Sequence, residues 1–106
     1  MKRLRYLAQA RKDLADIGEG LVANGASERV IHDLLEGIVA QCERIAAHDG
    51  LIGRTREELA PSLRSFALGR YIIFFRYEAA ELQIVHVLHG ARDIDAIFEQ
   101  ERDSET

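Results

Sequence analysis

The fold is decided by the segment LRSFALGRYIIFFRY, which spans residues 63–77. It contains two adjacent runs of β-branched and aromatic residues, and such side chains suit the half-buried surface of a sheet. The runs are separated at Gly69, because glycine adopts the positive φ of a tight turn without steric cost. The segment therefore predicts a β-hairpin. Its second strand is apolar at every position from Ile72 to Phe75 and is expected to be central in the sheet.

A third strand is expected immediately after this hairpin. Residues 82–89 form another apolar run, and residues 78–81 leave a gap of hairpin-loop length before it, so that three consecutive strands form an antiparallel meander. Asp93 is placed to cap a short final helix. The residues from about 100 to 106 lack an apolar anchor and are expected to form a frayed tail.

The first half of the chain is predicted to be mostly helical. Alternation in residues 3–7 indicates a short strand. Apolar residues then recur every three or four positions until Asn24 and Gly25, which predict the end of a first helix, and Ser27 is placed to cap a second. The predicted fold class is α+β: an N-terminal strand and a helical hairpin packed on an antiparallel sheet, with a short C-terminal helix.

Length, composition and charge predict a single globular domain. The chain has 106 residues, of which 47% are hydrophobic and 30% charged. It has no apolar run of the ~20 residues that span a bilayer, and its N-terminus does not resemble a secretory signal. The only cysteine, Cys42, fits the reducing cytoplasm, which is the expected location. A net charge of −4 argues against a protein that holds nucleic acid mainly by phosphate attraction.

The sequence contains no recognisable catalytic or metal-binding motif. Phosphate-binding loops, zinc-binding motifs and nucleophile elbows are all absent. His86 and His89 are three residues apart on a predicted strand, so they point to opposite faces and cannot hold one metal ion together. We interpret His86 as a core histidine that shares a face with Leu82, Ile84 and Leu88, and His89 as the better candidate for a functional surface. The expectation is a protein without enzyme activity, metal or cofactor.

Three runs resemble the C-terminal half of ParE-type toxins, in the RelE/ParE superfamily of bacterial toxin–antitoxin systems. They are Leu63-Arg64-Ser65-Phe66, Gly69-Arg70-Tyr71 and Val87-Leu88-His89-Gly90-Ala91-Arg92-Asp93-Ile94. Because the helical first half is similar too, the resemblance covers nearly the whole chain as one toxin domain, residues 1–106. It implies the same α+β fold and a toxin that inhibits DNA gyrase, and thereby replication, by binding.

The resemblance also implies a partner. Such toxins are neutralised by a ParD-like antitoxin, which has an N-terminal ribbon-helix-helix region and a C-terminal segment that wraps the toxin as helix and strand. Operator DNA is then contacted only indirectly, through the antitoxin. No membrane partner is expected.

Two other functions are left open by the sequence. RelE-type members are ribosome-dependent messenger-RNA endonucleases, an activity that would use Arg64, His89 and Arg92 here. However, the final helix has no tyrosine or histidine, and only Arg54, Arg56 and Arg64 resemble the basic cluster of those nucleases. General acid and base groups for RNA cleavage are therefore poorly supplied. The other possibility is a non-toxic module that only binds the antitoxin.

Two groups of binding residues are predicted. An anionic surface of a target is expected to contact Arg64, Arg70, His89 and Arg92, although each arginine alone also fits a solvated sheet face. An antitoxin segment that folds on the toxin needs apolar grooves and a receptive sheet edge. The candidates for this second role exceed what one helix stripe requires and also fit a wider core face: Leu21, Val22, Val30, Leu34 and Val39.

Overall fold

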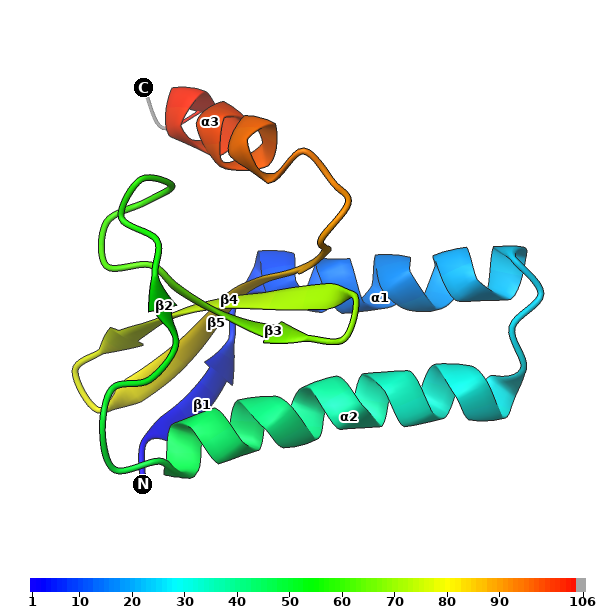
Figure 1. The fold of residues 1–106 in the computed structure, drawn as a ribbon, viewed down its shortest axis with the longest axis horizontal. Helices are drawn as coiled ribbons and strands as arrows, with labels where there is room; N and C mark the ends of the chain where they lie inside the picture. Colours follow the sequence, from blue (N-terminus) through cyan, green and yellow to red (C-terminus); the bar gives the residue numbers. More distant parts are fainter. Residues whose placement is uncertain (105–106) are drawn as a thin grey trace.

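The computed structural model describes residues 1–104, and residues 105 and 106 lie outside the described part of the chain. A helical hairpin stands beside a sheet, and a third helix lies across the sheet from it (Figure 1). The elements in chain order are β1 (Arg3–Tyr6), α1 (Ala8–Ala23), α2 (Glu28–Ala47), β2 (Arg54–Thr55), β3 (Arg64–Leu68), β4 (Tyr71–Glu78), β5 (Glu81–His89) and α3 (Ile94–Ser104).

The five strands form one sheet in the order β1-β5-β4-β3-β2. β3, β4 and β5 form the predicted antiparallel meander, with β4 between the other two. Gly69 has a φ of 58° in the turn between β3 and β4, as the sequence predicts. β1 joins the far side of β5 in parallel, pairing Arg3 with Glu81 and Tyr6 with Ile84. The sheet is therefore mixed, and the α+β fold class is confirmed.

The predicted helical hairpin is also confirmed. α1 ends at Ala23, and α2 begins after Ser27, whose hydroxyl oxygen accepts a hydrogen bond from the Val30 N–H at 3.2 Å. This bond satisfies one of the N–H groups that the first turn of a helix leaves unpaired. None of the helices in the described chain combines the length and apolar character that a membrane crossing requires.

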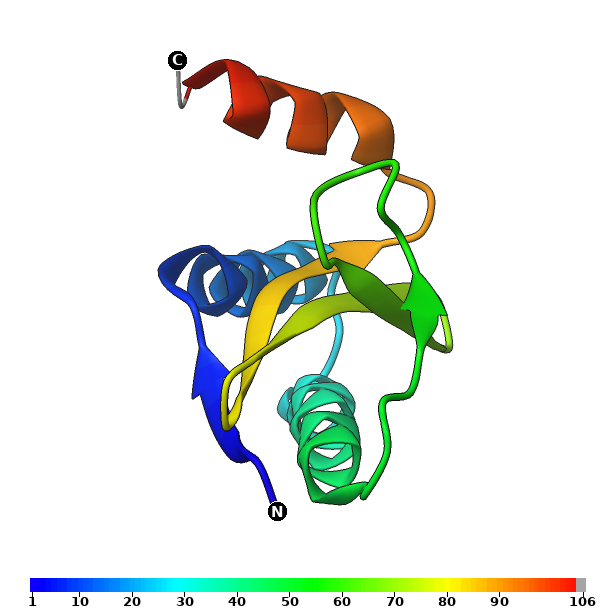
Figure 2. The same ribbon diagram turned by 90° about the vertical axis from the view of Figure 1, so that its left-hand side faces the viewer.

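Two apolar clusters lie on opposite faces of the sheet (Figure 2). On one face α2 packs against the sheet through fully buried side chains that include Ile38, Cys42 and Ile45. On the other face Phe98 of α3 packs edge-on against Phe74, with 5.2 Å between the ring centroids. Cys42 is fully buried, and burial raises the pKa of its thiol to about 11, so it packs as a small hydrophobic side chain.

A β-bulge in β5 corrects one sequence prediction. Phe75 of β4 pairs with Ile84, but its neighbour Phe74 pairs with His86, so Val85 is the extra residue. An extra residue reverses the alternation of side chains beyond it. His86 therefore faces the α3 side with Leu88, and the prediction that it shares a face with Leu82 and Ile84 is wrong.

The connection before β3 adds a two-residue strand that the sequence did not reveal. β2 pairs Arg54 with Ser65 and Thr55 with Arg64. Gly53, just before it, has a φ of 91°, and a Cβ there would lie 2.6 Å from the ring of Phe75. Only glycine fits such a close approach with a positive φ. Two residues are too few to show an alternating pattern.

The C-terminal helix is longer than expected. The predicted frayed tail is wrong for residues 100–104, because α3 continues to Ser104. Arg102 donates a hydrogen bond to the backbone carbonyl of Leu59 at 2.6 Å, and Glu101 contacts His86. Polar contacts thus hold a segment that has no apolar anchor. The part of the predicted tail at residues 105 and 106 lies outside the described residues.

Candidate functional site

Three of the four predicted target-binding residues lie together at one end of the sheet. His89 ends β5 and pairs with Tyr71 at the start of β4, where the two rings meet edge to face with centroids 5.3 Å apart. The N–H of Gly90 donates to the carbonyl of Arg70 at 2.8 Å, and the N–H of Arg92 donates to the carbonyl of His89 at 3.0 Å. Backbone bonds thus bring Arg70, His89 and Arg92 into one neighbourhood.

Arg64 lies elsewhere on the sheet. It pairs with Phe75, four ladder positions from Tyr71, which corresponds to about 13 Å along the strands. Its guanidinium donates to the carbonyl of Gly53 at 3.2 Å and lies 6.0 Å from the ring centroid of Tyr77. The structure does not bring Arg64 together with His89 and Arg92, the combination that the ribonuclease hypothesis requires.

Of the two other arginines in this region, Arg56 is engaged in contacts of its own and Arg54 is exposed. The Arg56 guanidinium pairs with Glu58 at 2.8 Å and lies 5.7 Å from the ring centroid of Phe74. Arg54, in β2, is exposed. This basic region is separate from the end of the sheet where His89 lies.

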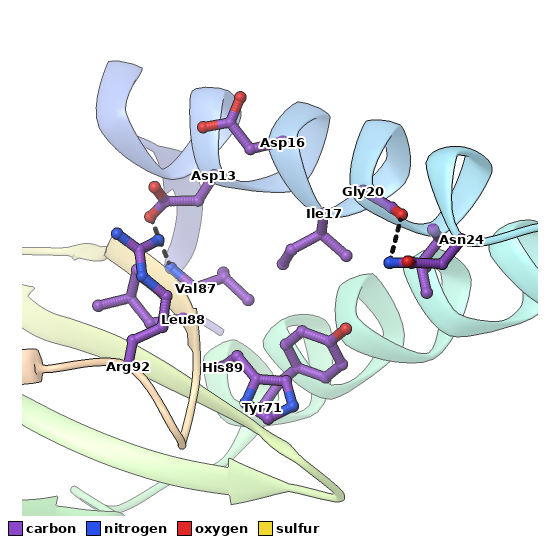
Figure 3. A pocket seen from close by; sticks show the side chains of 11 residues that line it. Asp13, Asp16, Ile17, Gly20, Asn24, Tyr71, Val87, Leu88, His89 and Arg92 are labelled. Carbon is purple, nitrogen blue, oxygen red and sulfur yellow. Dashed lines mark hydrogen bonds between the residues drawn. The ribbon is translucent and has the colours of Figure 1, made fainter.

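A groove of about 250 Å³ runs between α1 and the ends of β4 and β5 (Figure 3). Ile17, Leu21 and Leu88 are among the apolar side chains that line it. Asp16 and Arg92 lie toward one end of the groove and Asn24 lies at the other. The groove thus offers an apolar floor with a cation and a carboxylate at one end.

A second, more apolar hollow lies on the other side of Tyr71. It has a volume of about 360 Å³, and Leu34 and Gly37 of α2 line it together with Leu68 at the end of β3. Tyr71 lines both the groove and this hollow, so the two adjoin one another near the turn between β3 and β4. β2 covers only the first two residues of β3, and within the described chain Phe66 to Leu68 pair with no strand on that outer side.

Two of the predicted antitoxin-binding residues line these features. Leu21 lines the groove beside α1, and Leu34 lines the hollow beside α2. Val22 and Val30 are 65% and 54% exposed near the tip of the helical hairpin, which is far above what a core position shows. Val39 is half-buried on α2.

A buried polar network joins three elements beside the first groove. His86 is 2% exposed, and its Nδ1 lies 2.6 Å from Asp13 Oδ2 of α1. Its Nε2 contacts Glu101 Oε1 of α3. The same Asp13 oxygen accepts the backbone N–H of Val87 at 3.0 Å, because β1 ends before reaching this part of the β5 edge. We call Asp13, His86 and Glu101 the carboxylate–histidine clasp.

The clasp favours the charged form of its histidine. Burial by itself lowers the pKa of His86, but the hydrogen bonds and negative charges of Asp13 and Glu101 together outweigh burial, so the pKa is raised above its ordinary value of 6.5. Only an imidazolium has an N–H on both ring nitrogens to donate to two carboxylates. The geometry and the direction of the pKa shift therefore agree.

Sequence reasoning identified His86 as a core histidine but did not identify its polar partners. One signal was present for Asp13. It follows Ala10 by three residues and precedes Ile17 by four, so it lies on the apolar stripe of α1 where a carboxylate is unexpected. No comparable signal marked Glu101, because it lies in a stretch of charged residues.

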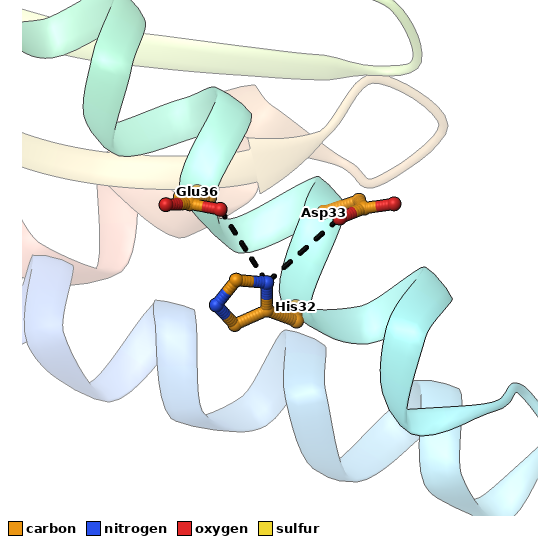
Figure 4. A group of neighbouring side chains, drawn as sticks. All are labelled: His32, Asp33 and Glu36. Carbon is orange, nitrogen blue, oxygen red and sulfur yellow. Dashed lines mark ion pairs between the residues drawn. The ribbon is translucent and has the colours of Figure 1, made fainter.

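One group of neighbouring side chains has the composition of metal ligands. Ligand atoms of His32, Asp33 and Glu36 all lie within 4.8 Å of one another (Figure 4). All three side chains are exposed on a single helix, and His32 and Glu36 are four residues apart, where ordinary ion pairs form. We assign no metal site to this group.

Comparisons with known proteins agree with this architecture. The model of the family described as "ParE toxin of type II toxin-antitoxin system, parDE" matches residues 4–94. Among solved structures, the chain is similar to a chain from the chromosomal ParDE toxin–antitoxin system of P. aeruginosa, with 26% sequence identity and a TM-score of 0.71. That similarity covers 84% of this chain and 96% of the other. No curated protein matches the chain.

The clasp predicts unequal effects for two aspartates of α1. Replacing Asp13 by alanine leaves the buried His86 and the Val87 N–H without their acceptor, so we expect Asp13→Ala to lower the free energy of unfolding by about 3–5 kcal/mol. Asp16→Ala, at an exposed position one turn away, should change it by less than about 0.5 kcal/mol. Urea unfolding at pH 6 measures both, and equal effects would contradict the role of Asp13.

Proposed function

Since this chain belongs to the ParE family of toxins from type II toxin–antitoxin systems, we propose that it arrests growth by binding DNA gyrase and that a ParD-like antitoxin neutralises it. The observation that supports binding is the grouping of Arg70, His89 and Arg92 beside a groove at one end of the sheet. Two exposed guanidinium groups and an imidazole there suit an acidic surface of a protein.

The proposal treats the protein as a binder without catalytic activity. RNA cleavage needs a base, an acid and a cation that converge on one phosphate. His89 uses its Nδ1 to accept the Ala91 N–H at 3.0 Å, and Arg64 lies at the other end of the strands. His86 is buried between two carboxylates. These positions support inhibition by contact rather than by bond cleavage. Because gyrase acts in the cytoplasm, we propose that the protein acts there too.

We further propose where the antitoxin binds. A helix of the antitoxin would cover the groove and the hollow on either side of Tyr71, and an adjoining extended segment would pair with the open edge of β3 from Phe66 to Leu68. Apolar hollows next to a free strand edge fit a partner that folds as helix and strand on binding. Operator DNA is then reached only through the antitoxin's own ribbon-helix-helix region.

Target binding is tested by the effect of one arginine on gyrase. We expect Arg92→Ala to weaken inhibition of gyrase-catalysed supercoiling by about tenfold, because an interface arginine commonly contributes this much. Arg54→Ala, which removes an exposed arginine of β2 at the other end of the sheet, should change inhibition less than twofold. Supercoiling assays with purified toxin measure both.

Three results would contradict the gyrase proposal. If Arg92→Ala and Arg54→Ala act alike, the target does not bind at this end of the sheet. If wild-type protein leaves gyrase active while primer extension finds new 5′ ends in translated messages, the toxin is a ribonuclease. If expression leaves growth unchanged while the antitoxin binds tightly, the protein is a non-toxic module.

Antitoxin binding is tested with two apolar surfaces of similar exposure. The double variant Val22→Asp/Val30→Asp should weaken binding of the cognate antitoxin at least a hundredfold, since charges would replace two exposed apolar side chains near the tip of the helical hairpin that the sequence predicts as antitoxin contacts. Leu51→Asp changes a residue that is 61% exposed in the connection after α2 and should have little effect. Calorimetric titration measures both, and equal losses would place the antitoxin elsewhere.

A further inference from the structure

We propose that the carboxylate–histidine clasp is a protonation-controlled device that holds α3 on the sheet and releases its C-terminal half when His86 loses a proton. The family model ends at residue 94, where α3 begins, so the helix held by the clasp lies beyond the matched region. The inference concerns the docking of α3 and is independent of gyrase binding.

The two carboxylates of the clasp differ in how easily each can lose its hydrogen bond to His86. The Asp13 side chain is 6% exposed and also accepts the Val87 N–H, so water cannot readily replace His86 there, and displacing Asp13 would leave the Val87 N–H without an acceptor. The Glu101 side chain is 44% exposed and is readily solvated. The Nε2 proton, shared with Glu101, is therefore the one that leaves.

Loss of that proton changes an attraction into a repulsion. A neutral imidazole keeps one N–H, which stays with Asp13, while Nε2 becomes a lone-pair acceptor that faces a carboxylate. Hydrogen bonds to charged groups are among the stronger ones in proteins, and a buried acceptor opposite an acceptor is unfavourable. The contact between β5 and the C-terminal half of α3 is then lost, and the proton passes to water on the exposed side of Glu101.

The charges around His86 favour its protonated form. A hollow of about 320 Å³ between α1 and α3 is lined by His86 and by five charged groups of the elements packed against it. These are Lys12, Asp13 and Asp16 of α1, Arg92 of the connection after β5, and Glu101 of α3. Three carboxylates and two cations give the surroundings of His86 a net negative charge, which favours the protonated imidazole.

The sign of the pH dependence follows from the raised pKa of His86. The stabilising contribution of the clasp is fully present below 6.5, the ordinary histidine value, and is lost as the pH rises through the higher value of the folded protein. α3 is therefore held most firmly below pH 6.5 and is loosened as the pH rises through the raised pKa of His86 in the folded protein.

Release has a structural consequence for the apolar face beneath α3. Phe98, which is 3% exposed, packs with Phe74, Leu63 and Leu88, and Ile94 and Ile97 of the same helix pack against this cluster. Arg102 contacts the Leu59 carbonyl from the end of the helix. Loosening the C-terminal half uncovers part of this face.

Amide hydrogen exchange of the full chain tests the clasp directly. Between pH 6 and pH 9, the protection factors of α3 amides, compared with those of α2 in the same sample, should fall roughly tenfold or more. Glu101→Gln should show lower α3 protection at pH 6 and little further change, because a neutral amide bonds either form of the imidazole. Glu99→Gln, at an exposed position of the same helix, should keep the wild-type profile.

The α2 amides report in each sample that the rest of the domain is folded. Protection of α3 that stays constant with pH in the wild type, or a wild-type pH profile in Glu101→Gln, would overturn the proposal. A loss of pH dependence in Glu99→Gln would overturn it as well, since general helix charge would then be the cause.

Discussion

One buried imidazole connects the parts of the chain on which this structure depends. His86 contacts Asp13, 73 residues earlier, and Glu101, 15 residues later, so it joins α1, β5 and α3 at one point. Asp13 Oδ2 also accepts the Val87 N–H and so continues the edge pairing of β5 beyond the end of β1. Because an unpaired charge in such a place is costly, each element is restricted to one position relative to the others.

The candidate binding surfaces lie together at one end of the sheet, on either side of Tyr71. α1 and α2 extend past the sheet, as Figure 1 shows, and apolar side chains of their distal halves are only partly covered. Tyr71 and Leu68 close the sheet side of the two hollows that result. The same end of the sheet carries His89 and Arg92. A surface of this kind fits the binding of other macromolecules, which agrees with membership of a toxin family that acts in a toxin–antitoxin pair.

Most of the fold was predictable, because local patterns specify it. The run from Ile72 to Phe75 indicated a central strand, Gly69 indicated the turn, and Ser27 indicated the start of α2. What failed depended on contacts between distant residues. The bulge at Val85, which reverses the face of His86, has no local signature, and neither has the two-residue β2.

The candidate site was predicted less completely for the same reason. The sequence selected four basic residues but gave no means of knowing that Arg64 lies about four strand positions from the other three. The end of α3 was mistaken for a tail because its anchors are Glu101 and Arg102, polar residues whose partners, His86 and the Leu59 carbonyl, lie far back in the chain. Polar contacts of this range are visible only once the fold is known.

The protonation state of His86 tests the central claim most directly. Nitrogen-15 NMR of histidine-labelled protein distinguishes an imidazolium from either neutral tautomer by the shifts of the two ring nitrogens. At pH 6.5, where an ordinary histidine is half protonated, the account predicts that both nitrogens of His86 carry a proton and that each N–H is hydrogen-bonded. A single neutral tautomer at that pH would contradict it, because one of the two carboxylates would then have no donor.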